Sequence, residues 1–212
     1  MASQSQLAVL LDLDGTLVDS AYLHVLAWDA AFVAAGYEVA HWRIHDSLGI
    51  GGDRLVPRLL GRHVPEAGDI SDDHKRRFVD SADRLRATDG ALALIDDLER
   101  RGVPFALATS ATGTEGEALL GALGRDDLPA AGADSVEAPK PAPDVLLAAC
   151  EQLDVPPERA VLIGDSPWDA DAAARVGARM IGVRCGGFGD DRLHGFGAVD
   201  VVDAPRDLIG RL

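Results

Sequence analysis

The sequence has little of three residue types that would each point to a particular class of protein. Of its 212 residues, two are cysteine, two are lysine and 5% are aromatic. Cys150 and Cys185 are too few for a disulfide framework. No apolar run approaches the roughly 20 residues needed to span a bilayer, and the first residues lack the basic-then-apolar pattern of a signal peptide. We expect a cytoplasmic protein with no membrane partner.

Positive charge is scarce as well. Twenty Lys and Arg residues stand against 35 Asp and Glu, which gives a formal net charge of −15. Nucleic-acid backbones and anionic membrane surfaces are bound by clustered basic side chains, so this balance argues against both partners. Any phosphate-bearing ligand needs a local positive group. Lys140 is the candidate because Pro139 and Pro141 stiffen the chain around it, whereas Lys75 lies in a charged run and is expected to be a solvated surface residue.

Short apolar runs alternate with helical patterns along most of the chain. The runs are Leu7–Leu13, Pro104–Ala108, Ala160–Ile163, Met180–Val183 and Val199–Val202. Continuous apolar runs are typical of parallel strands that are buried on both faces. Strands that alternate with helices predict an α/β fold with a doubly wound parallel sheet, a Rossmann-like core. We assign residues 1–18 and 89–212 to this core, whose ligands would bind at the carboxyl ends of the strands.

Residues 19–88 break the alternation and show no strand pattern. Their spacing predicts helices marked by Leu23, Leu26, Ala30 and Val33, by Leu55, Leu59 and Leu60, and by Phe78, Ala82 and Leu85 after an N-cap at Ser71. We predict an all-helical cap domain inserted after the first strand. Such an insertion would lie above the strand ends and could cover a site.

Two carboxylates follow the first apolar run. Asp12 and Asp14 are two residues apart, and residues at this spacing in a strand point in the same direction. Side-by-side carboxylates repel each other unless a cation lies between them, and hard oxygen ligands favour Mg²⁺. A solvated turn after a strand is the alternative for such a pair taken alone.

Polar side chains also follow the next two runs. Thr109 and Ser110 end the second run and precede a predicted helix, so they form either an anion cradle or an ordinary helix N-cap. Asp165 and Asp169 follow the third run immediately before another predicted helix. Because the carboxyl ends of parallel strands share one edge of the sheet, these groups together with Asp12 predict a single site.

Taken in order, four segments resemble the motifs of a known family. They are Asp-Leu-Asp-Gly-Thr (12–16), Leu-Ala-Thr-Ser (107–110), the segment around Lys140, and Gly-Asp-Ser-Pro-Trp-Asp (164–169). This ordered set resembles the haloacid dehalogenase superfamily over nearly the whole chain. The helical insertion, with its segment 48–56, is similar to the cap of the phosphoglycolate phosphatase and β-phosphoglucomutase branch. The resemblance implies a phosphoric monoester hydrolase that acts on a small phosphorylated metabolite.

The resemblance also implies a catalytic role for each matched residue. Asp12 would be the nucleophile that takes the phosphoryl group as an aspartyl phosphate. Asp14 would protonate the leaving oxygen and then activate water. Thr109, helped by the backbone N–H of Ser110, would hold a phosphoryl oxygen, and Lys140 would neutralise the transferring group. This agrees with the need to offset like-charge repulsion when a carboxylate attacks a phosphate.

A Mg²⁺ site is implied in the same way. Asp165 would bind the ion together with Asp12 and the backbone carbonyl of Asp14, and Asp169 would serve as a further ligand or support the ligands. The dehalogenases that give the superfamily its name work without a metal and lack an acid at the second motif position. Asp14 stands there in this chain, which favours phosphoryl transfer over dehalogenation.

Cap residues are candidates for contact with the rest of the substrate. The glycine-rich loop 49–52 would close over the site, so that Arg54 or His45 touches the non-phosphate part. The alternative is a surface loop in which Arg54 pairs with Asp53 or another carboxylate. His24 is a further candidate, close to the hinge between core and cap.

Three functional interpretations remain open from the sequence. His24 and Trp28 share a helix face and are similar to the corresponding stretch of the β-phosphoglucomutases, although a histidine packed on an aromatic ring explains them equally well. Those mutases typically carry an acidic residue before the aspartate of the last motif, where Gly164 stands here, so a phosphatase is favoured over a hexose phosphomutase. A non-catalytic metabolite-binding module is the third interpretation. Either a monomer or a homodimer is compatible with the sequence.

Overall fold

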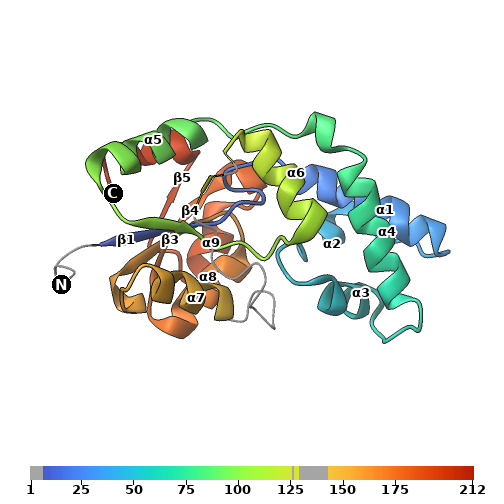
Figure 1. Ribbon diagram of the computed structural model, residues 1–212. Coiled ribbons are helices and arrows are strands. Elements are labelled where there is room, and N and C mark those ends of the chain that lie inside the picture. The colour runs from blue at the N-terminus through green and yellow to red at the C-terminus, as the bar shows by residue number, and fades with distance from the viewer. Residues whose placement is uncertain (1–6, 126, 129–142) are drawn as a thin grey trace.

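A computed structural model describes residues 7–125, 127–128 and 143–212. In it, a five-stranded parallel sheet of order β2-β1-β3-β4-β5 carries helices on both faces (Figure 1). The strands are β1 (Ala8–Leu11), β2 (Phe105–Leu107), β3 (Ala160–Gly164), β4 (Arg179–Val183) and β5 (Asp200–Val202). The predicted doubly wound α/β fold is confirmed, and each strand lies within or next to one of the predicted apolar runs.

Alternate side chains of β1 enter two different hydrophobic layers. Val9 and Leu11 pack in one cluster with residues of α5 (Ala91–Arg101) and α6 (Gly113–Leu123). Leu10 packs on the other face against α7 (Asp144–Gln152), α8 (Pro167–Val176) and α9 (Asp190–Phe196). Because both faces are covered, every residue of the strand is buried, which explains why the sequence shows a continuous apolar run there. The short 3₁₀ segments are 82–84, 157–159, 184–186 and 205–208.

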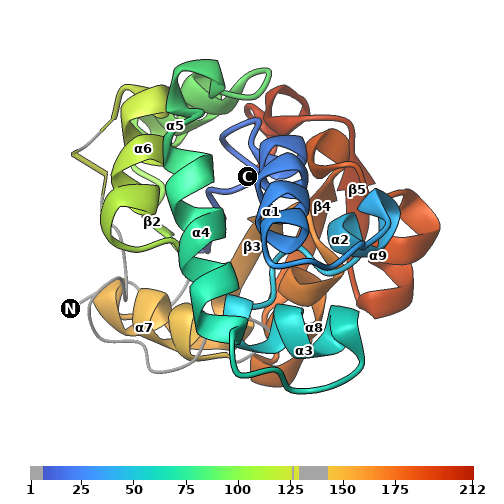
Figure 2. The ribbon, with the colours of Figure 1, turned by 90° about the vertical axis from the view of Figure 1, so that its right-hand side faces the viewer.

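The insertion forms a helical group beyond the carboxyl ends of the strands (Figures 1 and 2). It contains α1 (Ala21–Ala34), α2 (His41–His45), α3 (Gly52–Leu60) and α4 (Ala67–Val79). These helices share a hydrophobic cluster separate from the two clusters of the sheet, with Trp28, Phe32 and Ile44 among its buried members. None of the helices that the structure describes is long and apolar enough to cross a membrane.

Two details of the predicted insertion are wrong. Of the apolar residues that mark the first predicted helix, Leu26 and Val33 are 47% and 59% exposed, and α1 buries Val25 and Phe32 instead. Apolar residues occupy nearly the whole circumference of α1, so spacing alone did not distinguish the inner face. The third predicted helix begins at Ala67 rather than after Ser71, which lies inside α4.

The two segments that connect the insertion to the sheet pair with each other. The N–H of Asp19 donates to the carbonyl of Arg86, and the N–H of Thr88 donates to the carbonyl of Leu17, both at 2.9 Å. The predicted domain boundaries, after residue 18 and before residue 89, fall at this pairing. The division into core and cap domains itself stays a prediction.

A ring of side-chain contacts joins the far side of the insertion to α8 and α9. The Arg58 guanidinium lies 5.0 Å from the ring centroid of Trp168, and Trp168 meets Phe196 edge-on at 6.0 Å. Arg192 lies 4.9 Å from the ring centroid of Phe196 and donates to Asp46 at 2.8 Å. Asp46 closes the ring by accepting from Arg58 at 3.4 Å. The ring therefore places the insertion directly against α8 and α9.

The packing of α5 generates a stability prediction with an internal control. Leu98 is completely buried whereas Leu92, on the same helix, is 41% exposed. We expect Leu98→Ala to lower the free energy of unfolding by about 2–5 kcal/mol, because it leaves a cavity in the core, and Leu92→Ala to change it by less than about 1 kcal/mol. Urea denaturation measures both, and equal losses would contradict the assigned packing.

Candidate functional site

A cavity of about 590 Å³ lies between the carboxyl edge of the sheet and the helical insertion. Strand-end residues form one wall: Asp12, Asp14, Thr109, Ser110, Asp165 and Asp169. The other wall comes from α1, from α4 and from the glycine-rich loop 48–53. The structure thus brings the acids and hydroxyls of three separate strand ends to one place.

Backbone hydrogen bonds beyond the strands set the position of Asp12. Its N–H donates to the carbonyl of Ile163 in β3 at 2.9 Å. The N–H of Ala108 donates to the carbonyl of Leu11 at 2.8 Å. Because these bonds extend the parallel ladder by one residue on each side, Asp12 lies between the ends of β2 and β3, beside Thr109 and Asp165.

Three carboxylates gather at this edge of the sheet. Each of Asp12, Asp165 and Asp169 offers an oxygen within 4.8 Å of the other two, and the three residues are 5%, 6% and 1% exposed. The Thr16 hydroxyl donates to Asp165 Oδ1 at 3.2 Å. A buried set of hard oxygen donors suits a hard divalent cation.

The loop after β4 touches the same set. A Cβ atom added to Gly186 would lie 1.7 Å from Oδ2 of Asp165, so only glycine allows the backbone to approach this carboxylate. The thiol of Cys185 is also affected, since burial and the charge of Asp165 raise the pKa of Cys185 to about 12. Cys185 therefore stays a neutral thiol at ordinary pH, in agreement with the absence of any sequence signal for a nucleophilic cysteine.

Asp169 is held by the first turn of α8. Its Oδ2 accepts from the backbone N–H of Ser166 at 3.0 Å and from the Ser166 hydroxyl at 2.6 Å. Together with the bond from the Asp169 N–H to the serine hydroxyl, this forms a capping box, with Pro167 in the first helical position. The pattern Ser-Pro-Trp-Asp therefore contains a local signal for the orientation of Asp169.

Asp14 is oriented by two side chains. The Ser20 hydroxyl donates to Asp14 Oδ1 and itself accepts from the Gly15 N–H at 2.8 Å. On the other side, His24 Nε2 lies 2.6 Å from Asp14 Oδ2. Burial lowers the pKa of His24, but the charge of Asp14, its hydrogen bond and the charge of Glu115 outweigh burial and leave the pKa above its ordinary value. Ser20 and His24 therefore hold the two oxygens of the Asp14 carboxylate in place.

The hydroxyl pair after β2 has one buried and one exposed member. Thr109 is 5% exposed and its Oγ1 accepts from the Ala111 N–H at 3.1 Å. Ser110 is exposed, and both residues line the cavity. Thr112 occupies the N-cap position of the helix that follows, α6, without a side-chain capping hydrogen bond, so neither predicted hydroxyl is its N-cap. Lys140 lies outside the described residues.

Two predicted substrate-binding residues are not brought to the cavity. His45 Nε2 lies 2.8 Å from the carbonyl oxygen of Gly186, and its ring stacks between Tyr22 and Phe188 at 5.3 and 4.5 Å. Arg54 is exposed, and neither it nor His45 belongs to the cavity lining. Their contact with a substrate stays a prediction without geometric support.

Three lining residues were missed. Lys75, expected only as a solvated surface residue, is exposed yet lines the cavity, where it is the single Lys or Arg among the residues that the structure describes. His74, one residue before it, and Glu115, in the first turn of α6, also line the cavity. Their positions relative to the strand ends depend on how α4 and α6 pack, which no local motif records.

Comparison with known proteins agrees with this geometry. A family model described as haloacid dehalogenase-like hydrolase matches residues 7–177. The chain is 30% identical over 209 residues to an N-acetylmuramic acid 6-phosphate phosphatase of Pseudomonas aeruginosa, covering 95% of this chain and 92% of that protein. It is 31% identical over 214 residues to a phosphoglycolate phosphatase of Rhodospirillum rubrum, covering 92% and 86%. A crystal structure of a hydrolase from Pseudomonas syringae matches with a TM-score of 0.93 and 32% identity over 97% of both chains.

The family match spans the strand ends that carry Asp12, Thr109 and Asp165, and it includes the helical insertion. The resemblance inferred from the ordered motifs is thereby confirmed. The chain belongs to the haloacid dehalogenase-like hydrolase family.

Proposed function

We propose that the protein is a Mg²⁺-dependent phosphatase of small phosphorylated metabolites that works through a phosphorylated Asp12. The observation that carries this proposal is the convergence of Asp12, Asp14 and Thr109 with two further buried acids in one cavity. The relatives named as phosphatases support the reaction class.

The strand-end acids fit Mg²⁺ by their donor chemistry. Asp12, Asp165 and Asp169 supply carboxylate oxygens, which are hard ligands, and no softer donor belongs to this group. Asp169 already has one oxygen in the capping box, so Asp12 and Asp165 would hold the ion and Asp169 would support it. Bound there, Mg²⁺ supplies positive charge that offsets repulsion between Asp12 and the substrate phosphate.

The side chains of the cavity would then perform two successive transfers. An oxygen of Asp12 attacks the phosphorus, the ester P–O bond breaks, and Asp14 gives its proton to the leaving alkoxide. Asp14 next takes a proton from water, whose oxygen attacks the aspartyl phosphate and releases inorganic phosphate and the Asp12 carboxylate. Thr109 and the Ser110 N–H would hold a phosphoryl oxygen throughout, and Lys140 would add positive charge.

Asp14 needs a fixed position to serve both transfers. The Ser20 hydroxyl and His24 contact different oxygens of its carboxylate, which holds the group at the cavity wall. Proton transfer depends on such positioning, because the acid must lie within hydrogen-bonding distance of the oxygen it protonates.

The last motif favours hydrolysis over a mutase reaction. A Cβ atom added to Gly164 would lie 2.7 Å from Cγ of Asp169, so the acidic residue typical of the mutases has no room in this arrangement. The mutase interpretation predicts isomerisation of a hexose phosphate with a bisphosphate primer at a rate above hydrolysis. We expect phosphate release to be the faster reaction.

The wall of the cavity that the helical insertion forms, here called the cap wall, would bind the part of the substrate that is not transferred. The Lys75 ammonium lies 4.0 Å from Asp72, and both side chains are exposed. An anionic substrate group would therefore displace this weak contact. Together with the sugar phosphate and phosphoglycolate named for two relatives, this favours phosphorylated sugars or acids as substrates.

Removal of the nucleophile tests the reaction. We expect Asp12→Asn to lower Mg²⁺-dependent phosphate release from a panel of phosphate esters by at least about a thousandfold, because an amide cannot form the phosphorylated intermediate. Asp19→Asn, an exposed acid nearby in the chain, is the control and should keep full activity. Absence of phosphate release from every ester by the unmodified enzyme, or full activity in Asp12→Asn, would refute the proposal.

Substitutions at two glycines test whether Asp165 binds the metal ion. Gly186→Ala places a methyl group against Asp165, whereas a Cβ at Gly189 meets nothing within 4 Å. We expect isothermal titration calorimetry to show weaker Mg²⁺ binding by about tenfold or more in Gly186→Ala, because the carboxylate must move. The control, Gly189→Ala, should bind Mg²⁺ with unchanged affinity. Unchanged Mg²⁺ affinity in Gly186→Ala would contradict the role of Asp165 as a ligand.

Substitution of Lys75 tests whether the cap wall binds the substrate. We expect Lys75→Ala to raise KM for anionic substrates by about tenfold, with a smaller effect on kcat, because the lost charge acts on substrate binding. Arg76→Ala is the matched control, since Arg76 is paired with Asp73 and is not part of the cavity lining. Unchanged KM in Lys75→Ala would place substrate recognition elsewhere.

A further inference from the structure

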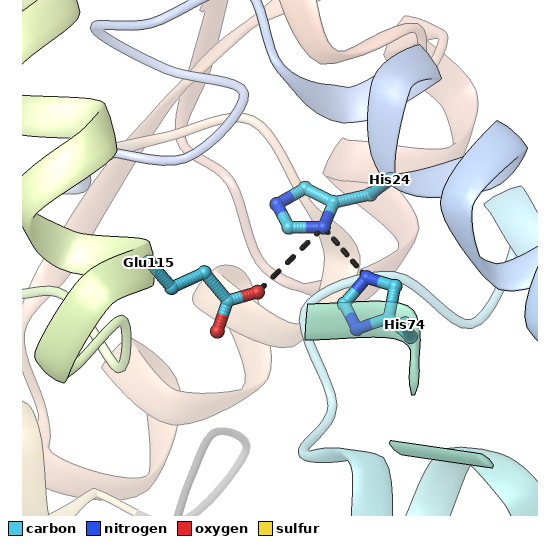
Figure 3. A group of neighbouring side chains, drawn as sticks. All are labelled: His24, His74 and Glu115. Atoms are coloured by element: carbon cyan, nitrogen blue, oxygen red, sulfur yellow. Dashed lines mark hydrogen bonds and ion pairs between the residues drawn. The ribbon is translucent and has the colours of Figure 1, made fainter. Parts of the chain in front are cut away.

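Two histidines and a glutamate from three different helices meet in the cavity (Figure 3). None of them is one of the three strand-end acids. His24 lies on α1, His74 on α4 and Glu115 on α6. His24 Nδ1 is 2.9 Å from His74 Nε2 and 3.9 Å from Glu115 Oε1. The three side chains thus direct two ring nitrogens and a carboxylate oxygen at one small volume.

The spacing of these atoms suits a tetrahedral transition-metal ion. With metal–ligand bonds of about 2.1 Å, neighbouring ligand atoms in such a site are about 3.4 Å apart. The separations of 2.9 Å and 3.9 Å from His24 Nδ1 lie on either side of that value, and all three ligand atoms lie within 4.8 Å of one another. Small side-chain adjustments would therefore complete the geometry.

The environment of each histidine is that of a metal ligand. The second nitrogen of His24, Nε2, lies against the carboxylate of Asp14 at 2.6 Å, an arrangement that orients metal-bound imidazoles in many proteins. His74 is 4% exposed and stacks on Trp28 at a centroid distance of 3.9 Å, so its ring cannot turn freely. Burial and the charges of His24 and Lys75 lower the pKa of His74 well below its ordinary value, which leaves a neutral imidazole.

We propose that His24, His74 and Glu115 form a second metal site, which takes a transition-metal dication of the Zn²⁺ type. Imidazole nitrogens favour Zn²⁺ and its neighbours in the periodic table, whereas the all-carboxylate edge of the sheet suits Mg²⁺. The two sites therefore differ in ligand chemistry although they share a cavity. An ion bound by this cluster ties α1 and α4 of the insertion to α6 of the core, and it lies beside Asp14.

A proton shared between the two histidines is the alternative to a bound metal ion. A proton between His24 Nδ1 and His74 Nε2 also accounts for their 2.9 Å separation, and it needs no contribution from Glu115. A metal ion, by contrast, requires the carboxylate as well as both nitrogens. Loss of Glu115 therefore distinguishes the two.

The test counts bound Zn²⁺ in folded protein by equilibrium dialysis and elemental analysis. Because Zn²⁺ can also enter the strand-end acids, the background variant is Asp165→Asn, which disables that site. His74→Phe, which keeps the aromatic stack, and Glu115→Gln are each added to this background. The control is His41→Phe in the same background, because His41 forms an imidazole–carboxylate pair with Asp29 at 3.3 Å and is exposed.

We expect Asp165→Asn to retain one equivalent of Zn²⁺, and both His74→Phe and Glu115→Gln to lose it, while the His41→Phe control retains it. Co²⁺ in place of Zn²⁺ should give the intense visible absorption of a tetrahedral nitrogen–oxygen site, lost in the same two variants. Absence of bound Zn²⁺ in Asp165→Asn, or binding that survives either cluster variant, would overturn the proposal. Neither result depends on phosphatase activity, so the proposed function is tested separately.

Discussion

Electrostatic repulsion between buried carboxylates is the constraint that the rest of the site must compensate. Asp12, Asp165 and Asp169 lie side by side at the edge of the sheet and are almost fully buried. Moving an ionised group out of water costs several kcal/mol unless hydrogen bonds or a cation compensate. The surrounding structure provides hydrogen bonds from Thr16 and Ser166, and the donor set is suited to a divalent ion. Bringing the three carboxylates together therefore lowers the stability of the fold, and a bound metal ion would offset this loss.

The helical insertion completes the site from the opposite side. His24 reaches across from α1 to Asp14, and Lys75 adds positive charge to an otherwise acidic cavity. On the far side, the contacts among Arg58, Trp168 and Asp46 hold the insertion against α8. Because Trp168 directly precedes Asp169 in α8, the position of the insertion and the metal-binding edge are physically connected.

Local sequence signals predicted those parts of the site that the backbone itself determines. The apolar runs located the strands, and the residues that follow a parallel strand necessarily lie at one edge of the sheet. Asp12, Thr109 and Asp165 were predicted for this reason. The buried face of α1 was not, because its apolar residues surround the helix. The Ser-Pro-Trp-Asp pattern is a helix-capping signal, and the capping box that it forms orients Asp169.

By itself, the sequence determined the α/β class, the place of the helical insertion and the strand-end acids, since each depends on spacing along a few consecutive residues. Only the tertiary structure decided that His24, His74 and Glu115 meet, that Lys75 lines the cavity, and that Arg54 and His45 do not. These outcomes depend on how separate helices pack. A difference of one helical turn moves a side chain by about 5 Å, and no local pattern in the sequence specifies it.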